Sequence, residues 1–95
     1  YSNTYNEIES FLTERNISKG MSFIGQIYDD AVLTEIFINV VMIILRKSLI
    51  EAANHNKIEE QESLVKQLDF VLKLSRQLET NVNSRLMLEN LLLQL

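Results

Sequence analysis

Residues 31–53 read AVLTEIFINVVMIILRKSLIEAA and contain neither glycine nor proline. Apolar side chains occupy almost every angle around the middle of this stretch, which is typical of a central helix that other helices surround. Residues 36–45 are rich in β-branched side chains, so a buried strand is the alternative, but a stretch this long without a turn signal exceeds the length of a strand. We therefore predict a central helix, which Asp29 and Asp30 are suited to cap with their carboxylates.

This apolar stretch is not expected to cross a membrane. A spanning helix needs about 20 consecutive apolar residues, whereas Glu35 and Asn39 interrupt the first half and Arg46 and Lys47 end the run. The stretch does not resemble a signal peptide either, because it is internal and lacks a charged leader and a small-residue cleavage site. Since the chain holds no cysteine, which is compatible with a reducing compartment, we expect a cytoplasmic protein.

Two shorter helices are predicted ahead of the central one. The first presents one apolar face, formed by Tyr5, Ile8, Phe11 and Leu12. The second presents another, formed by Met21, Ile24, Ile27 and Tyr28. Asn16 or Ser18 is suited to cap the second helix by accepting backbone N–H bonds. Gly20 and Gly25 each weaken this helix by about 1 kcal/mol, and Gly25 is the position expected to allow a neighbouring helix to approach closely.

A fourth helix is predicted over residues 57–80, after a polar loop at residues 53–56. Its expected inner face comprises Ile58, Leu64, Val65, Leu68, Val71, Leu72, Ser75 and Leu78. The opposite face is charged, as solvent requires. Two i,i+4 pairs of opposite charge, Glu62–Lys66 and Asp69–Lys73, are expected to add support.

A last helix is predicted over residues 84–95, after a break at Asn81-Val82-Asn83, with Asn83 suited to cap it. Seven of the twelve positions from 84 to 95 are leucine or methionine, a wider apolar band than one core face requires. One interpretation is a short helix wedged into a small core. The other is that another subunit covers part of this helix or of the fourth.

These elements predict an all-α fold, a single domain over residues 1–95 built as a compact bundle of about five helices. The chain has 95 residues, of which 46% are hydrophobic and 23% charged, an ordinary globular composition. Its 13 acidic and 9 basic residues give a net charge of −4, which argues against direct binding of nucleic acid. Because the chain begins with Tyr1 rather than Met, we expect it to be the C-terminal fragment of a longer protein.

Residues that could carry catalysis or hold a cofactor are scarce. His55 is the only histidine and lies in a polar loop, and without cysteine it cannot build a structural zinc site. Asp29 and Asp30 lack the acidic loop that a calcium cage needs. The sequence contains no phosphate-binding loop with Gly, Lys and Ser/Thr at nucleotide-binding spacing. We therefore expect this fragment not to be an enzyme and to use no metal, cofactor or small-molecule ligand.

Residues 78–93, LETNVNSRLMLENLLL, resemble the ending of the C-terminal collar domain of bacterial DNA polymerase III clamp-loader subunits. In that family a long helix ends in leucine, an Asn-Val-Asn turn follows, and a final helix reads Arg-Leu-x-Leu-Glu-x-Leu-Leu-Leu. The matching positions here are Asn81, Val82, Asn83, Arg85, Leu86, Leu88, Glu89, Leu91, Leu92 and Leu93. The resemblance is greatest to the delta-prime subunit, with gamma/tau as the alternative. The family often has proline where this chain has Ser84.

The resemblance implies an assembly role in DNA replication. Five collar domains form a ring that holds the ATPase modules of the clamp loader, so the partners of this domain would be the gamma/tau and delta subunits, and the parent protein would belong to the DNA polymerase III holoenzyme. Asn81 and Asn83 would fix the turn and cap the last helix. Leu86, Leu88, Leu91 and Leu92 would pack within the bundle or against a neighbour.

Two points stay open from the sequence. The i,i+4 pair of Arg85 and Glu89 is either intrahelical or intersubunit. The alternative functions are a free-standing helical dimerisation or adaptor domain unrelated to replication, and a folded appendage without a partner.

Overall fold

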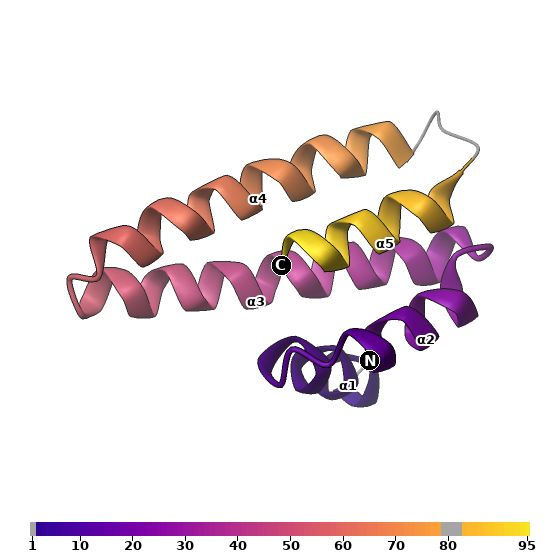
Figure 1. Cartoon of the computed structure of the whole chain (residues 1–95), viewed down its shortest axis with the longest axis horizontal. Coiled ribbons are helices and arrows are strands. Elements are labelled where there is room, and N and C mark those ends of the chain that lie inside the picture. The colour runs from indigo at the N-terminus through magenta and orange to yellow at the C-terminus, as the bar shows by residue number, and fades with distance from the viewer. Residues whose placement is uncertain (1, 79–82) are drawn as a thin grey trace.

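The computed structural model describes residues 2–78 and 83–95, and these form helices joined by short connections (Figure 1). The helices are α1 (Ser2–Thr13), α2 (Ile17–Ile27), α3 (Ala31–Asn54), α4 (Ile58–Leu78) and α5 (Ser84–Gln94). The all-α prediction of about five helices is therefore confirmed.

The two longest helices, α3 and α4, form an antiparallel hairpin that sets the 40 Å length of the molecule (Figure 1). Helix α5 packs between α4 and α2, while α1 and α2 pack against α3 and against each other. In Figure 1, α5 lies across the front of the hairpin and α1 and α2 lie along the edge formed by α3. The turn end of the hairpin extends beyond all three shorter helices.

Side-chain oxygens cap the starts of α2 and α3. Asn16 accepts a hydrogen bond from the backbone N–H of Lys19 at 3.1 Å, so it is the cap of α2 in preference to Ser18. Asp30 accepts from the second and third N–H groups of α3 at 3.0 and 3.1 Å, while Asp29 is not the capping residue. Each cap satisfies N–H groups that have no partner within the helix, which confirms the predicted helix starts.

The centre of the core is a cluster of three phenylalanines from α1, α2 and α3. The ring centroids of Phe11, Phe23 and Phe37 lie 5.6 to 6.5 Å apart, within the range of favourable aromatic contacts. Ile8 and Ile24, which the predicted faces contain, are fully buried beside this cluster. Phe23 is missing from the predicted face of α2. Met21, Ile24, Ile27 and Tyr28 already complete a helical apolar face, so their spacing gave no reason to include Phe23.

The close approach of a neighbouring helix occurs at Gly20, so the prediction that placed it at Gly25 is wrong. A Cβ atom added to Gly20 would lie 2.5 Å from Cδ2 of Leu92, which shows that α5 presses directly on the α2 backbone there. At Gly25 the nearest atom, Nη2 of Arg85, would be 3.6 Å away, an ordinary contact. The difference arises because Gly20 faces α5 and is buried, whereas Gly25 lies at the rim.

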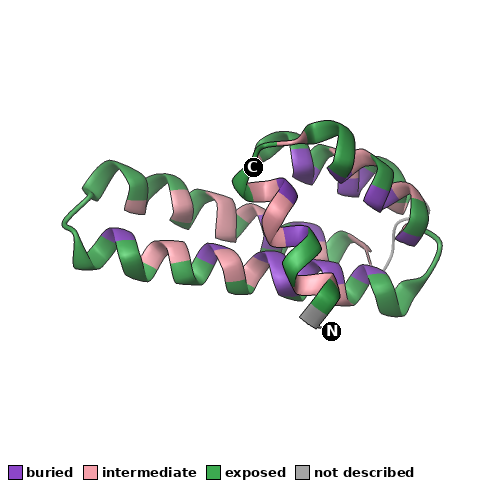
Figure 2. Cartoon of the chain, turned by 90° about the horizontal axis from the view of Figure 1, so that it is seen from below, coloured by how far each residue is buried: buried purple, intermediate pink, exposed green. Residues whose placement is uncertain are grey.

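Helix α3 is not surrounded on all sides, contrary to prediction. Val32, Ile43 and Ile50 are 64%, 46% and 61% exposed, because the shorter helices cover only part of the circumference of α3 (Figure 2). The inner face predicted for α4 is only partly right. Leu64, Leu68, Val71 and Leu78 pack in or against the core, whereas Ile58, Val65 and Leu72 are exposed. The buried Leu74 is missing from the predicted face.

The charged face of α4 forms one of its two predicted ion pairs. Lys73 Nζ lies 3.0 Å from Asp69 Oδ2, whereas Glu62 and Lys66 do not come within ion-pair distance among the described residues. An exposed pair of this kind contributes little to stability, about 0.3–0.5 kcal/mol.

Candidate functional site

Most of the apolar band on α5 belongs to the core of the bundle. Leu88 and Leu91 are fully buried, and Leu92 and Met87 are at least nine-tenths buried, because these positions face α2 and α4. Three of the predicted site residues, Leu88, Leu91 and Leu92, therefore pack within the chain. The interpretation of α5 as a helix wedged into a small core holds for this face.

Two leucines of α5 point away from the core. Leu86 is 54% exposed and Leu93 is 59% exposed. Among the leucines predicted as site residues, Leu86 alone is placed to contact another molecule. The apolar residues of α5 that the core does not bury are thus these two leucines, which lie near opposite ends of the helix.

The polar residues at the start of α5 attach this helix to the end of α2. Asn83 caps α5 by accepting from the backbone N–H of Leu86 at 3.3 Å, as predicted. Ser84 donates its hydroxyl to the backbone carbonyl of Tyr28 at 2.9 Å, and the Arg85 guanidinium lies 5.1 Å from the Tyr28 ring centroid. Ser84 therefore makes a tertiary hydrogen bond that helical spacing does not reveal. Asn81 lies outside the described residues.

Arg85 and Glu89 form the intrahelical pair, with Nε and Oε2 3.6 Å apart. The Arg85 side chain is about half exposed, so this pair contributes only about 0.3–0.5 kcal/mol. The intrahelical alternative left open by the sequence is thus the one found within this chain.

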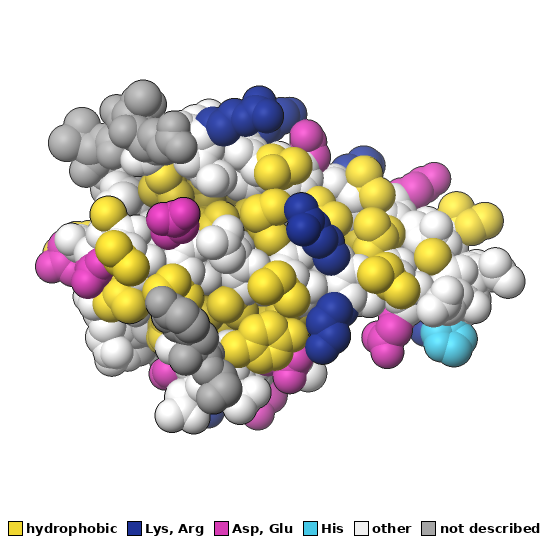
Figure 3. All heavy atoms as spheres, turned by 180° about the vertical axis from the view of Figure 1, so that it is seen from behind, with side chains coloured by type: hydrophobic (Ala, Val, Ile, Leu, Met, Phe, Trp, Pro, Cys, Tyr) yellow, Lys and Arg dark blue, Asp and Glu magenta, His cyan; other side chains and the backbone are white. Residues whose placement is uncertain are grey.

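Exposed apolar side chains are also present on the α3–α4 hairpin. Six residues at heptad spacing are named here the hairpin stripe: Ile36, Ile43 and Ile50 on α3, and Ile58, Val65 and Leu72 on α4. Five of these side chains are 43–67% exposed, and Ile36 is half-buried. Figure 3 views the molecule from behind, where hydrophobic side chains gather along the hairpin with Lys and Arg side chains among them.

The sequence predicts buried positions here, because apolar side chains surround the middle of α3 and because Ile58, Val65 and Leu72 belong to the predicted inner face of α4. Five of these residues are exposed instead, whereas Ile36 is half-buried and packs against the core cluster. Contiguous exposed apolar patches on soluble proteins commonly mark sites of interaction.

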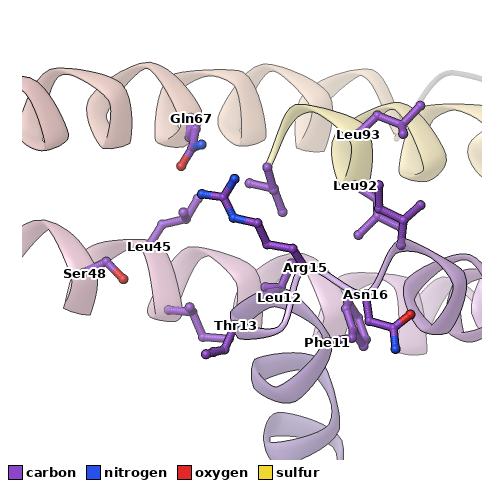
Figure 4. Close-up of a pocket in the computed structure, with 13 residues that line it drawn as sticks. Phe11, Leu12, Thr13, Arg15, Asn16, Leu45, Ser48, Gln67, Leu92 and Leu93 are labelled. Carbon is purple, nitrogen blue, oxygen red and sulfur yellow. The ribbon is translucent and has the colours of Figure 1, made fainter.

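The best-formed cavity has a volume of about 310 Å³ and lies where the α1–α2 turn meets α3, α4 and the end of α5 (Figure 4). Its walls are mainly apolar, and Arg15, a non-glycine residue at a φ of 53°, is the one charged side chain among the residues that line it. Figure 4 shows Arg15 extending across the cavity toward Leu45 and Gln67. The lining contains no acid, histidine or thiol, so an acid–base pair cannot form in it.

Elsewhere, the described residues contain no group of three or more His, Cys, Asp or Glu side chains that could hold a metal ion. His55 is exposed beside the turn between α3 and α4. None of the helices in the described part of the chain combines the length and apolar content needed to cross a bilayer.

The candidate site is therefore the set of exposed apolar positions on the hairpin together with Leu86 and Leu93. No protein-family model matches the chain, and no curated protein or solved structure is similar to it.

Proposed function

We propose that this chain is an assembly domain of the bacterial DNA polymerase III clamp loader, most similar to the collar domain of the delta-prime subunit, with gamma/tau as the alternative. In this role its helices would pack against the collar domains of the gamma/tau and delta subunits in the cytoplasm. The assembled complex would then load the sliding clamp during DNA replication. The domain itself would act as a tether, without catalysis and without direct contact with nucleic acid.

The exposed hairpin stripe is the observation that carries the assembly role. A chain of 95 residues that leaves five of these apolar side chains 43–67% exposed on the α3–α4 hairpin gains free energy when another helical surface covers them. The acidic net charge of −4 favours a protein partner over a nucleic acid.

The specific family rests on the motif at residues 78–93. The described part of that motif has a coherent structural role, because Asn83 caps α5 and the buried leucines insert α5 into the bundle. Leu86 and Leu93, exposed near the two ends of the same helix, are the motif leucines available to a neighbouring subunit.

Light-scattering chromatography of the chain mixed with gamma/tau and delta subunits from the same source tests the proposal. We expect the chain to co-migrate with them as a defined hetero-complex. A chain that stays apart from both subunits, whether as a monomer or as a homodimer, would contradict the clamp-loader assignment.

A substitution on the surface of α5 tests whether this helix takes part in the interface. Leu86→Asp is expected to weaken the hetero-complex while leaving the helical content unchanged, because Leu86 is outside the core. Asn90→Asp, another exposed position on the same helix, is the matched control and should bind as the unmodified chain does. Equal binding by both variants would exclude Leu86 from the interface.

The hairpin stripe also suits a free-standing dimerisation or adaptor domain unrelated to replication, since an apolar helical face does not by itself select its partner. Co-migration with the clamp-loader subunits separates the two functions, because only the first requires those subunits.

A further inference from the structure

Arg15 has a backbone conformation that usually belongs to glycine. Its N–H donates to the carbonyl of Leu12 at 3.3 Å, and the N–H of Asn16 donates to the carbonyl of Phe11 at 2.9 Å. This pair of hydrogen bonds forms a turn that commonly ends a helix, with a left-handed residue at its corner. The φ of Arg15 is 53°, a conformation that glycine adopts freely and that a Cβ atom makes costly. A role for the arginine side chain would account for its presence at this position.

The side chain of Arg15 lies over the apolar cavity between the α1–α2 turn, α3, α4 and the end of α5. Phe11, Leu45 and Leu92, each less than one-tenth exposed, form the buried part of the cavity wall. Figure 4 shows the guanidinium end of Arg15 directed toward Leu45 and Gln67. Among the described residues, no side chain forms an ion pair or a hydrogen bond with the Arg15 guanidinium. The cavity therefore combines apolar walls with one cation that the described part of the chain does not neutralise.

A second, more polar hollow adjoins this cavity. It has a volume of about 620 Å³, and Arg15, Ser48 and Gln67 line both spaces. Glu51 and Glu60 are among the other residues that line the hollow. Three side chains that can donate hydrogen bonds thus lie at the boundary between an apolar space and a polar one. An elongated molecule with one polar end fits this boundary, with its apolar part inside the cavity.

From this arrangement we infer that the chain binds a medium-chain monocarboxylate, with the carboxylate at Arg15 and the alkyl tail in the cavity. A guanidinium binds a carboxylate through two parallel N–H···O hydrogen bonds, which fixes the orientation of the acid. Ser48 and Gln67 are the further donors at the same boundary. Such a ligand is a departure from the sequence, which predicts none. It also goes beyond the proposed function, because its binding requires no other subunit.

The surrounding charges favour a head group with a single negative charge. Lys57, the other cation at the polar hollow, has its Nζ 3.8 Å from Oε1 of Glu60 and is therefore already paired. Glu51 lines the same hollow without an ion pair to any described residue. The second negative charge of a phosphate monoester would face these acidic side chains, and like charges repel. Arg15 alone neutralises a carboxylate.

The size of the cavity sets the length of the tail. Its volume of about 310 Å³ is roughly twice that of an apolar cavity of ~150 Å³ that holds one benzene molecule. An acid of roughly eight to ten carbon atoms therefore fills the space. Ile17 and Leu93, which are 49% and 59% exposed, line the same cavity. The tail would cover part of both side chains, and this burial of apolar surface favours binding.

Isothermal titration calorimetry of the chain alone with sodium octanoate tests the inference. We expect one octanoate to bind per chain and to raise the melting temperature, because it binds the folded state. Butanoate has too short a tail to fill the cavity, and octan-1-ol has no charge, so each should bind at least about tenfold more weakly. Absence of octanoate binding, or equal binding of octan-1-ol, would overturn the inference. Neither result would bear on assembly with clamp-loader subunits.

A pair of charge-removing substitutions assigns the carboxylate to Arg15. Arg15→Gln keeps a long polar side chain at the same backbone position and should weaken octanoate binding about tenfold or more, because the charged hydrogen bonds are lost. Arg76→Gln, at an exposed arginine of α4 that does not line the cavity, is the matched control and should bind as the unmodified chain does. Equal weakening by both substitutions would reflect net charge alone and would contradict a site at Arg15.

Arg15→Gly separates ligand binding from a structural role of the arginine. Glycine adopts the left-handed conformation without strain, so this variant should unfold at the same urea concentration as the unmodified chain or at a higher one. The same variant should no longer bind octanoate measurably. An Arg15→Gly chain that binds octanoate as tightly as the unmodified chain would exclude the guanidinium from the site and overturn the inference.

Discussion

Gly20 and Gly25 lie five residues apart on α2, yet their surroundings differ. Leu92 presses on Gly20, so this position needs the missing side chain, whereas Gly25 has room for a methyl group beside the flexible Arg85. Glycine at position 25 only weakens the helix by its backbone entropy.

Gly20→Val is expected to destabilise the fold by about 1–3 kcal/mol, because the new side chain must displace Leu92 in a packed core. Gly25→Ala should leave stability unchanged or raise it by up to about 1 kcal/mol through helix propensity. Urea unfolding followed by circular dichroism measures both. If Gly20→Val were as stable as the unmodified chain, α5 would not approach α2 at this point.

At the scale of the element, α5 divides its leucines between the core and the surface. Leu88 is fully buried and Leu93 is 59% exposed, although both belong to the same apolar band in the sequence. The polar anchors at Asn83 and Ser84 fix the start of α5, and so they determine which leucines face inward.

Leu88→Ala is expected to reduce the free energy of unfolding by about 2–5 kcal/mol, the cost of a cavity in a packed core. Leu93→Ala, measured while the chain is monomeric, should change it by less than about 0.5 kcal/mol. Thermal and urea denaturation of the two variants provide the comparison. Similar losses at both positions would mean that α5 is rotated from the orientation described here.

At the scale of the whole molecule, the hairpin is unevenly supported. Between residues 46 and 70 the one buried residue is Ala52, because α1, α2 and α5 cover only the other end of the hairpin (Figure 1). Regions with few buried apolar contacts open at lower free energy than the rest of a fold.

Backbone amides at residues 46–70 are therefore expected to exchange with solvent faster than those of α2 and of residues 36–45 in the monomer. Hydrogen exchange at low protein concentration measures this difference. Uniform protection along α3 at low concentration would show that the turn end is as stable as the core.

Local features of the chain were sufficient to predict the all-α class and the approximate bounds of the helices. They limited the caps to Asn16 or Ser18, to Asp29 and Asp30, and to Asn83, and the structure selects Asn16 and Asp30 from these candidates. These depend on interactions within a few residues, namely hydrogen bonds at helix starts and the repeat of apolar side chains along one turn after another. For the same reason the sequence excluded a central strand at residues 36–45.

The tertiary structure alone decided which apolar residues are buried. Helices α3 and α4 each carry a broad band of apolar side chains. The spacing of these side chains is therefore compatible with more than one buried face. The positions of the neighbouring helices decide which face is buried. Gly20 against Leu92 and Ser84 against Tyr28 are contacts between distant parts of the chain that no local pattern encodes. Five residues of the hairpin stripe are exposed because three short helices cannot cover both faces of two long ones.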